Sequence, residues 1–230
     1  MTPTRKKTLG AKATETRQRI VDSALELFGE VGYDKATMRA IAERANVAPS
    51  NAYYYFASKE DLVQAFYARI HEEHLAVVED AVAAERSLKG RLLAVMRTKL
   101  DTMEPYHPFA GTLFKTAADP ASPLNPFSPE SGPVREEATA VFGRAIEGSR
   151  TKVPADLADE LPGLLWTWHM SIVLFWIHDT SPERRRTWRL TERTVDLIVK
   201  LLKVSGLPLM GPLRRSALRL VVELREDDGK

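Results

Sequence analysis

The feature that most constrains the fold is the stretch from Thr37 to Phe56, where two short helices are predicted on either side of a tight turn. Thr37 can cap the first helix through its side-chain oxygen. Asn46 stands where the chain must turn sharply, because asparagine accepts a left-handed backbone more readily than most residues. Pro49 suits the first turn of a second helix, which we predict over Pro49 to Tyr55. This pattern is typical of a helix-turn-helix, which places its second helix in the major groove of DNA.

Helices on both sides of this pair complete a compact head. An apolar stripe that ends at Gly32 predicts a first helix over Arg17 to Val31. Ser58 and Asp61 form a capping box, which predicts a further helix from Lys59 to about Ala84. The stripe consists of Ile20, Ala24, Leu27, Phe28 and Val31.

From about residue 14 to 66 the chain resembles the DNA-binding domain of the TetR family of bacterial transcription regulators. The resemblance rests on the first helix, the helix pair, the aromatic ending Tyr53-Tyr54-Tyr55-Phe56 and the helix start Ser58-Lys59-Glu60. Two departures stand out. Asn46 replaces the usual glycine, and Ala48-Pro49 replaces the usual serine cap and its variable, often basic neighbour, which predicts a looser start of the second helix and one fewer DNA contact.

The side chains of the second helix suggest how DNA is contacted. The amide of Asn51 can pair with an adenine, and the hydroxyl of Ser50 can serve several bases. The hydroxyls of Tyr53 and Tyr54 suit the DNA backbone, with plain packing as the alternative for both rings. The family resemblance implies further contacts that position the head. The predicted DNA-binding residues are Thr37, Arg39, Pro49, Ser50, Asn51, Tyr53, Tyr54 and Lys59.

Charge and composition narrow the setting. The first 59 residues carry a net charge of +4, whereas the whole chain carries +2. We expect residues 1–13 to be a disordered basic arm, which either lies along DNA or is simply solvated. The absence of cysteine excludes disulfides and thiolate metal sites and fits a cytoplasmic protein. We expect no secretory signal, because no apolar run follows the basic start.

The rest of the chain predicts an all-α fold of about nine or ten helices, with a three-helix head over residues 14–60 and a helical body over residues 61–230. Helices are expected over residues 88–104, 109–118, 133–148, 156–178, 182–204 and 213–226. Five prolines make residues 119–133 a loop, either a lid or a disordered connection. The apolar run Leu161–Ile177 is short for a membrane span, and its tryptophans lie at its middle, so we expect a buried helix.

The family resemblance implies that the body binds a small molecule and forms a homodimer through its last long helices, here near residues 156–178 and 182–204. The residues give a separate argument, because the first of these helices is apolar on two faces and cannot bury both against one neighbour. The arginine run from Arg184 to Arg193 is expected to be solvated or paired, with an anion site as the alternative.

Methionine and aromatic side chains from several helices of the body could line a cavity for an apolar effector, although ordinary core packing is the alternative for each of them. The predicted ligand-binding residues are Met96, Met103, Phe114, Phe142, Trp168 and His169. We expect no metal and no cofactor. His71 and His74 are three residues apart rather than in a His-Glu-x-x-His pattern, so we expect them on a solvated helix face.

The sequence therefore predicts a dimeric, ligand-responsive DNA-binding regulator, most simply a repressor, that acts on a palindromic operator. A helical carrier or adaptor that has lost operator recognition is the second hypothesis, and the missing cap at Ala48 is its support. An enzyme is the third, and no phosphate loop, metal cluster or nucleophile motif favours it.

Overall fold

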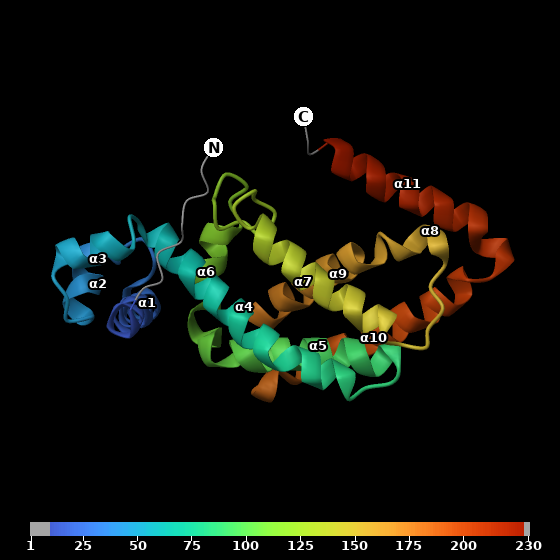
Figure 1. Cartoon of the computed structure of the whole chain (residues 1–230), viewed down its shortest axis with the longest axis horizontal. Coiled ribbons are helices and arrows are strands. Elements are labelled where there is room, and N and C mark those ends of the chain that lie inside the picture. The colour runs from blue at the N-terminus through green and yellow to red at the C-terminus, as the bar shows by residue number, and fades with distance from the viewer. Residues whose placement is uncertain (1–9, 228–230) are drawn as a thin grey trace. The chain divides into compact units, whose positions relative to one another are not determined.

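The computed structural model describes residues 10–227, which form helices and no strand (Figure 1). The predicted all-α class is confirmed: ten α-helices have seven or more residues, and one has a single turn. The contacts divide the chain into an N-terminal unit, Met1–Ile70 with Tyr106–Gly132, and a C-terminal unit, His71–Pro105 with Pro133–Lys230. This division rests on the contacts between residues. The domain boundary expected at residue 60 rests on the helix-turn-helix motif instead, and it stays a prediction.

The N-terminal unit consists of five helical segments around one apolar core (Figure 1). Phe28 of the first helix, Ile41 of the second and Phe66 of the fourth are almost fully buried there. The ring of Tyr106 lies 4.8 Å from that of Phe66, so the segment after residue 105 belongs to this core. The helices are α1 (Ala11–Val31), α2 (Met38–Arg44), α3 (Pro49–Tyr55), the first part of α4 (Lys59–Ala83), and α6 (His107–Ala117).

Helix α1 begins earlier than the sequence predicted. It starts at Ala11 rather than Arg17, and its N-cap residue Gly10 makes no side-chain hydrogen bond. Lys12 is therefore helical and not part of a basic arm. The remainder of the predicted arm, with Arg5, Lys6 and Lys7, lies outside the described residues.

The loop expected over residues 119–133 is a chain of hydrogen-bonded turns. The backbone N–H of Phe127 donates to the side chain of Asn125 at 2.8 Å, and the side chain of Gln64 donates to the carbonyl of Pro123 at 2.5 Å. Leu124 is buried, which anchors the segment to the N-terminal unit. Its role as a lid stays a prediction.

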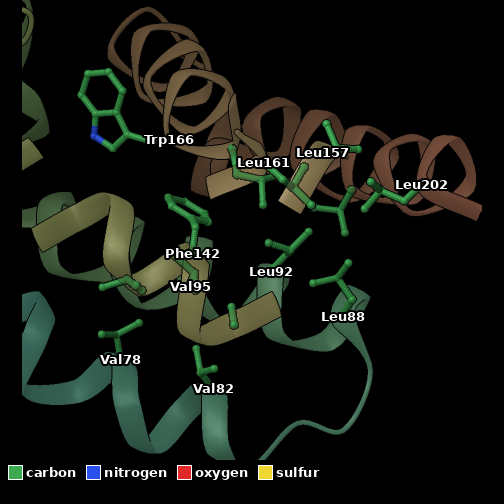
Figure 2. Close-up of a cluster of buried hydrophobic side chains, with 14 residues drawn as sticks. Val78, Val82, Leu88, Leu92, Val95, Phe142, Leu157, Leu161, Trp166 and Leu202 are labelled. Atoms are coloured by element: carbon green, nitrogen blue, oxygen red, sulfur yellow. The ribbon is translucent and has the colours of Figure 1, made fainter. Parts of the chain in front are cut away.

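The C-terminal unit is a bundle whose core is drawn in Figure 2. Val78 and Val82 point into it from α4, Leu92 and Val95 from the helix Leu88–Met103, and Phe142 from the helix Gly132–Glu147. Leu161 and Leu202 close it from the helices Leu161–Ile177 and Arg185–Ser205. The elements are the rest of α4, α5 (Leu88–Met103), η1 (Glu104–Tyr106, reaching into the N-terminal unit), α7 (Gly132–Glu147), α8 (Ala155–Ala158), α9 (Leu161–Ile177), η2 (Pro182–Arg184), α10 (Arg185–Ser205), η3 (Pro208–Met210) and α11 (Gly211–Asp227).

Two predicted helices are interrupted near their starts. The helix expected from residue 156 is split into α8 and α9, with Pro162 in the first turn of α9, where a missing N–H costs nothing. The helix expected from Pro182 begins at Arg185 instead, because Glu183 and Arg184 both have a φ of 53°. Two consecutive left-handed residues cannot belong to a regular right-handed helix.

A buried carboxylate holds the connection between α9 and α10. Asp179 accepts hydrogen bonds from the backbone N–H and the hydroxyl of Thr187, at 2.8 and 2.7 Å, and from the N–H of Ser181 at 2.9 Å. Burial opposes its ionisation, but the hydrogen bonds from Ser181 and Thr187 outweigh that effect and hold the pKa of Asp179 well below its usual range. The guanidinium of Arg184 donates to the Asp179 carbonyl at 2.8 Å and pairs with Glu104 at 3.4 Å.

Helix α9 is buried on several sides within one chain. Leu165 and Trp176, from one predicted face, and Trp166 and Val173, from the other, are all buried. Among the helices of residues 10–227, none combines the length and the apolarity that crossing a bilayer requires.

Candidate nucleic-acid interface

The turn between α2 and α3 has the geometry that the sequence predicted. The side chain of Thr37 accepts from the N–H of Ala40 at 3.2 Å and so caps α2. Asn46 has a φ of 52°, in the left-handed region, and the N–H of Val47 then donates to the Ala42 carbonyl at 3.0 Å. The left-handed residue reverses the chain within a few residues, which fixes the angle between α2 and α3.

Buried residues behind α3 hold it in place. Ala52 on α3 is fully buried, as are Ile41 and Ala42 on α2, and Phe56 closes the helix end. The guanidinium of Arg17 lies 4.9 Å from the centre of the Phe56 ring. Small alanines at the contact let the two helices approach closely, so α3 is a supported helix and not an isolated turn.

The other face of α3 is exposed. Pro49, Ser50 and Asn51 lie at its N-terminal end, and Tyr53 and Tyr54 follow with 55% and 73% of their surface exposed. Neither ring is therefore buried in the core, although the ring of Tyr54 lies 5.2 Å from that of Tyr55, and contact of the two hydroxyls with DNA stays a prediction. No side chain caps the N-terminus of α3, because Ala48 has no acceptor.

Lys59, one of the predicted DNA-binding residues, already makes contacts within the head. The ammonium of Lys59 donates to the carbonyl of Tyr33 at 2.7 Å and lies 4.3 Å from the centre of its ring. The hydroxyl of Tyr33 donates in turn to Glu60 at 2.6 Å, and burial together with that bond raises the pKa of Tyr33. Arg39 is exposed, so its charge is free to face DNA.

Sequence reasoning missed two arginines that fasten the helices of the head. Arg19 on α1 donates to the carbonyl of Ala45 at 2.9 Å and so satisfies the end of α2. Arg44 forms an ion pair with Glu30, which lowers the pKa of that carboxyl through the hydrogen bond between them. A basic residue in the last turn of α2 was the only local signal for either contact.

Family models match both parts of the chain. The model described as bacterial regulatory proteins, tetR family, matches residues 20–66. The model described as tetracyclin repressor-like, C-terminal domain, matches residues 91–223, which is more than half of the chain. The chain belongs to the TetR family. The resemblance noted in the sequence is thereby confirmed, and it extends well beyond the head.

Curated relatives match shorter stretches of the chain than the family models do. The transcriptional regulator UidR of Escherichia coli K12 is 40% identical over 65 residues, which are 28% of this chain and 33% of UidR. The regulator SrpR of Pseudomonas putida is 39% identical over 87 residues, 37% of this chain and 40% of SrpR. The chain thus spans between a third and two fifths of the length of these relatives.

Solved structures share the TetR fold along most of the chain. A TetR transcriptional regulator from Nitrosomonas europaea aligns with a TM-score of 0.63 at 20% identity, over 79% of this chain and 96% of that one. A TetR-family regulator from Syntrophomonas wolfei gives 0.59 at 20% identity, over 85% of this chain and 98% of that one. At such identities the likeness shows the fold alone.

The six predicted effector residues are only partly brought together. Met96, Phe142 and His169 are buried in the C-terminal unit, and the rings of Phe142 and His169 lie 5.9 Å apart. Met103 and Trp168, in the same unit, are half-buried, and Trp168 donates to the hydroxyl of Thr194 at 3.0 Å. The sixth residue, Phe114, belongs to the N-terminal unit.

An open pocket of about 700 Å³ lies between α5 and α10, and none of the six predicted effector residues lines it. Its walls include Trp188 and Leu93 among charged side chains, and Lys89 pairs there with Asp196 at 2.6 Å. The arginines of the run differ in their surroundings. Arg184 pairs with Glu104, whereas Arg185, Arg189 and Arg193 line this open pocket.

The expectation that His71 and His74 lie on a solvated face was wrong, because both are buried. They continue the inward positions of α4, since His74 lies one helical turn before Val78 and two before Val82. That register was the signal in the sequence. Within residues 10–227, no group of three or more candidate ligands is placed to hold a metal ion.

Proposed function

We propose that this protein is a DNA-binding transcriptional regulator that acts as a homodimer on a near-palindromic operator and responds to a small molecule. The observation that carries the proposal is the exposed start of α3, presented by a buried contact through Ala52. A helix that is packed against its neighbours on one face and exposed to solvent on the other is suited to insertion into the major groove. Membership of the TetR family, and the naming of UidR and SrpR as transcriptional regulators, support the same function.

The proposed contacts fall into two classes. Asn51 and Ser50, near the start of α3, read base edges, and an asparagine amide can both donate to and accept from one adenine. Thr37, Arg39 and the two exposed tyrosines contact the sugar–phosphate backbone, which positions α3 without reading sequence. The ammonium of Lys59 donates one hydrogen bond to Tyr33, and its remaining N–H groups contact the same sugar–phosphate backbone.

The proposed dimer forms through an exposed apolar stripe on α10. Leu197, Leu201 and Val204 expose about half of their surface and recur at helical spacing, and Leu174 on α9 is exposed as well. Contiguous exposed leucines on a helix mark a surface that association can cover. Two heads in such a dimer would contact half-sites about 34–36 Å apart, one turn of the duplex.

The proposal predicts that the protein binds a short near-palindrome upstream of its own gene or of a neighbouring gene. Footprinting on these fragments, at several salt concentrations, should give a protected site with two half-sites one helical turn apart. Equal affinity for all fragments at moderate salt would contradict sequence reading. It would favour the second hypothesis, a helical adaptor, for which the uncapped start of α3 is the specific support.

The repressor role follows from simple occlusion of a promoter by a bound dimer. An effector would release the repressor if it bound better to a conformation whose heads are misplaced for one face of the duplex. Transcription measured from the footprinted promoter, with and without the protein, tests the sign of this effect.

A further inference from the structure

The open pocket between α5 and α10 is large enough for a small molecule. Its volume is about 700 Å³, and small-molecule sites in proteins typically have about 300–1,000 Å³. All the residues that line it belong to the C-terminal unit. We call this cavity the α5–α10 pocket, and the side chains of its lining determine which class of molecule fits.

Three arginines form a row along one flank of α10 in this pocket. Arg185, Arg189 and Arg193 are spaced four residues apart, so their side chains lie on the same face of the helix. Like charges at this spacing repel each other. All three residues are exposed, and within residues 10–227 none of their guanidinium groups forms an ion pair or a hydrogen bond. The arginine row is therefore free to bind an anion, and a bound anion would relieve the repulsion.

The other charges of the α5–α10 pocket leave a small positive excess. Lys89 is neutralised by Asp196, whose carboxylate lies 2.6 Å from its ammonium. Glu183 and Glu192 also line the pocket. Four cations and three carboxylates thus give the lining a net charge of +1. One negative charge on a ligand balances this excess, whereas the two glutamates would repel a ligand with several negative charges.

The apolar part of the lining suits a flat ring. Trp188 on α10 and Leu93 on α5 both line the pocket, and both are half-buried. An indole ring stacks on flat aromatic molecules, and a guanidinium group stacks on them as well. The α5–α10 pocket therefore combines a surface for an aromatic ring with donors for an anionic group.

We propose that the effector of this regulator is an aromatic acid with a single negative charge, and that it binds in the α5–α10 pocket. Its carboxylate pairs with the arginine row at Arg189, the central residue, and its ring packs against Trp188 and Leu93. This inference rests on the proposed response to a small molecule and narrows its chemistry. It also places the effector away from the six residues predicted from the sequence, none of which lines this pocket.

Helix α10 connects the α5–α10 pocket to the proposed dimer contact. Arg193, at one end of the arginine row, lies about one helical turn before Leu197 of the exposed stripe. A ligand between α5 and α10 therefore acts on the helix that carries the proposed contact between subunits. It changes operator affinity to the extent that it binds one arrangement of α10 better than another.

The test compares aromatic acids with analogues that differ in charge or in the ring. Phenylacetate, cinnamate and naphthoate are titrated into the full-length protein by calorimetry, each beside its uncharged primary amide. Terephthalate serves as the aromatic dianion and octanoate as the acid without a ring. At least one aromatic acid should bind about tenfold or more tightly than its amide, since a carboxylate paired with a guanidinium forms charge-assisted hydrogen bonds. Equal binding of acids and amides, tighter binding of terephthalate or octanoate, or no binding by any compound overturns the proposal.

Two arginine variants assign the effect to the pocket. Arg189→Gln should weaken the acid by about fivefold or more without weakening the amide. Arg186→Gln removes the same charge from the same helix, but Arg186 lies over the ring of Phe175 outside the pocket, so this variant should bind the acid like the wild type. Because Arg189 is exposed and unpaired, the Tm of Arg189→Gln should match that of the wild type. Unchanged acid binding by Arg189→Gln, or an equal loss in Arg186→Gln, contradicts the site.

A tryptophan variant tests the surface for the ring. Trp188→Leu should weaken the acid and its amide by similar factors, because it removes stacking and leaves the charges in place. A loss confined to the acid, or no loss for either compound, contradicts the proposed position of the ring.

Operator binding is measured first without any acid, so that the two proposals can fail independently. A protein that protects an operator but does not distinguish acids from amides keeps the proposed regulator function and loses this inference. A protein that prefers aromatic acids but binds no operator keeps the acid site and loses the regulator function. Saturating acid should then weaken operator binding, and an unchanged operator affinity would contradict the effector role of the acid.

Discussion

At the scale of single residues, Asn51 has the most specific of the roles proposed for the head. Its side chain is exposed at the start of α3, and its amide matches the donor and acceptor of adenine in the major groove. We expect Asn51→Ala to weaken binding to the footprinted operator by about 1–3 kcal/mol and to reduce discrimination at one base pair of each half-site. Fluorescence titration against the operator and its single-base variants measures both effects.

Arg39→Ala provides the contrast for that experiment. Its exposed guanidinium is proposed to contact phosphate, so the variant should weaken all DNA sequences alike and lower the slope of log affinity against log salt by about 1. A uniform loss for Asn51→Ala as well, with no change in base preference, would rule out the adenine contact.

Asp179 is a residue on which stability and pH are linked. Its pKa is lowered in the folded state, so its contribution to stability is present above the unfolded pKa of about 3.9 and is lost as the pH falls below it. Asp179→Asn should lower the free energy of unfolding at pH 7 by about 1–3 kcal/mol, because an amide cannot accept from Ser181 and Thr187 together.

Urea unfolding at pH 7, 5 and 3.5 measures the Asp179 effect. The difference between wild type and Asp179→Asn should shrink at the lowest pH, because the Asp179 carboxyl of the unfolded chain takes up a proton there while that of the folded chain, with its lowered pKa, stays ionised. Asp80→Asn, an exposed residue on α4, serves as the control and should change stability little at any pH. A difference that grows on acidification would contradict the linkage.

At the scale of elements, α3 is short and has no side-chain cap. Ala48 has an extended backbone with φ −64° and ψ 143°, which is the conformation of an N-cap residue. Ala48→Ser should therefore add a hydrogen bond to the start of α3 and stabilise the protein by about 1 kcal/mol. Thermal unfolding measures the gain as an increase in Tm.

Ala48→Val is the matched control, because it adds bulk at the same exposed position without an acceptor. It should give no comparable stabilisation. Equal gains for serine and valine would mean that packing, and not capping, limits the stability of this helix.

Local signals explain which elements the sequence predicted well. Pro49 and the Ser58–Asp61 box each act within four residues, and α3 and α4 begin where they indicated. The start of α1 was missed because Gly10 offers no side-chain cap to read. The core of the head was predictable for the same reason as its helices, since the burial of Ile41 and Ala52 follows from helical spacing.

Features that depend on distant residues were beyond the sequence. The left-handed pair before α10 is held by Arg184 against Glu104, eighty positions earlier. Lys59 resembled a free phosphate contact, yet its ammonium is bound by Tyr33.

At the scale of the whole molecule, the stripe on α10 is the proposed contact through which two heads would act together. Leu201 exposes 57% of its surface at the centre of that stripe. Leu201→Glu should weaken the proposed dimer by about 2 kcal/mol or more, a factor of about 30 in Kd, since each subunit would bury a carboxylate against leucine. Sedimentation equilibrium measures the change, and operator affinity should fall with it.

Val77→Glu is the control for the stripe. Val77 is an equally exposed apolar residue on α4, outside the stripe, so its replacement should leave the sedimentation of the protein unchanged. A monomeric wild type, or a dimer that tolerates Leu201→Glu, would remove the stripe from the proposed interface.

The N-terminal unit is discontinuous in sequence, because Tyr106–Gly132 returns to it after the chain has left at Ile70. Phe109 packs beside Gly29 of α1, so close that an added methyl group there would be in contact with its ring. Excision of residues 1–70 would consequently strip α1 of that cover and expose an apolar flank to water. The part of the chain that is proposed to read the operator is thus not a separable module, and a chimera would have to include both segments of the unit.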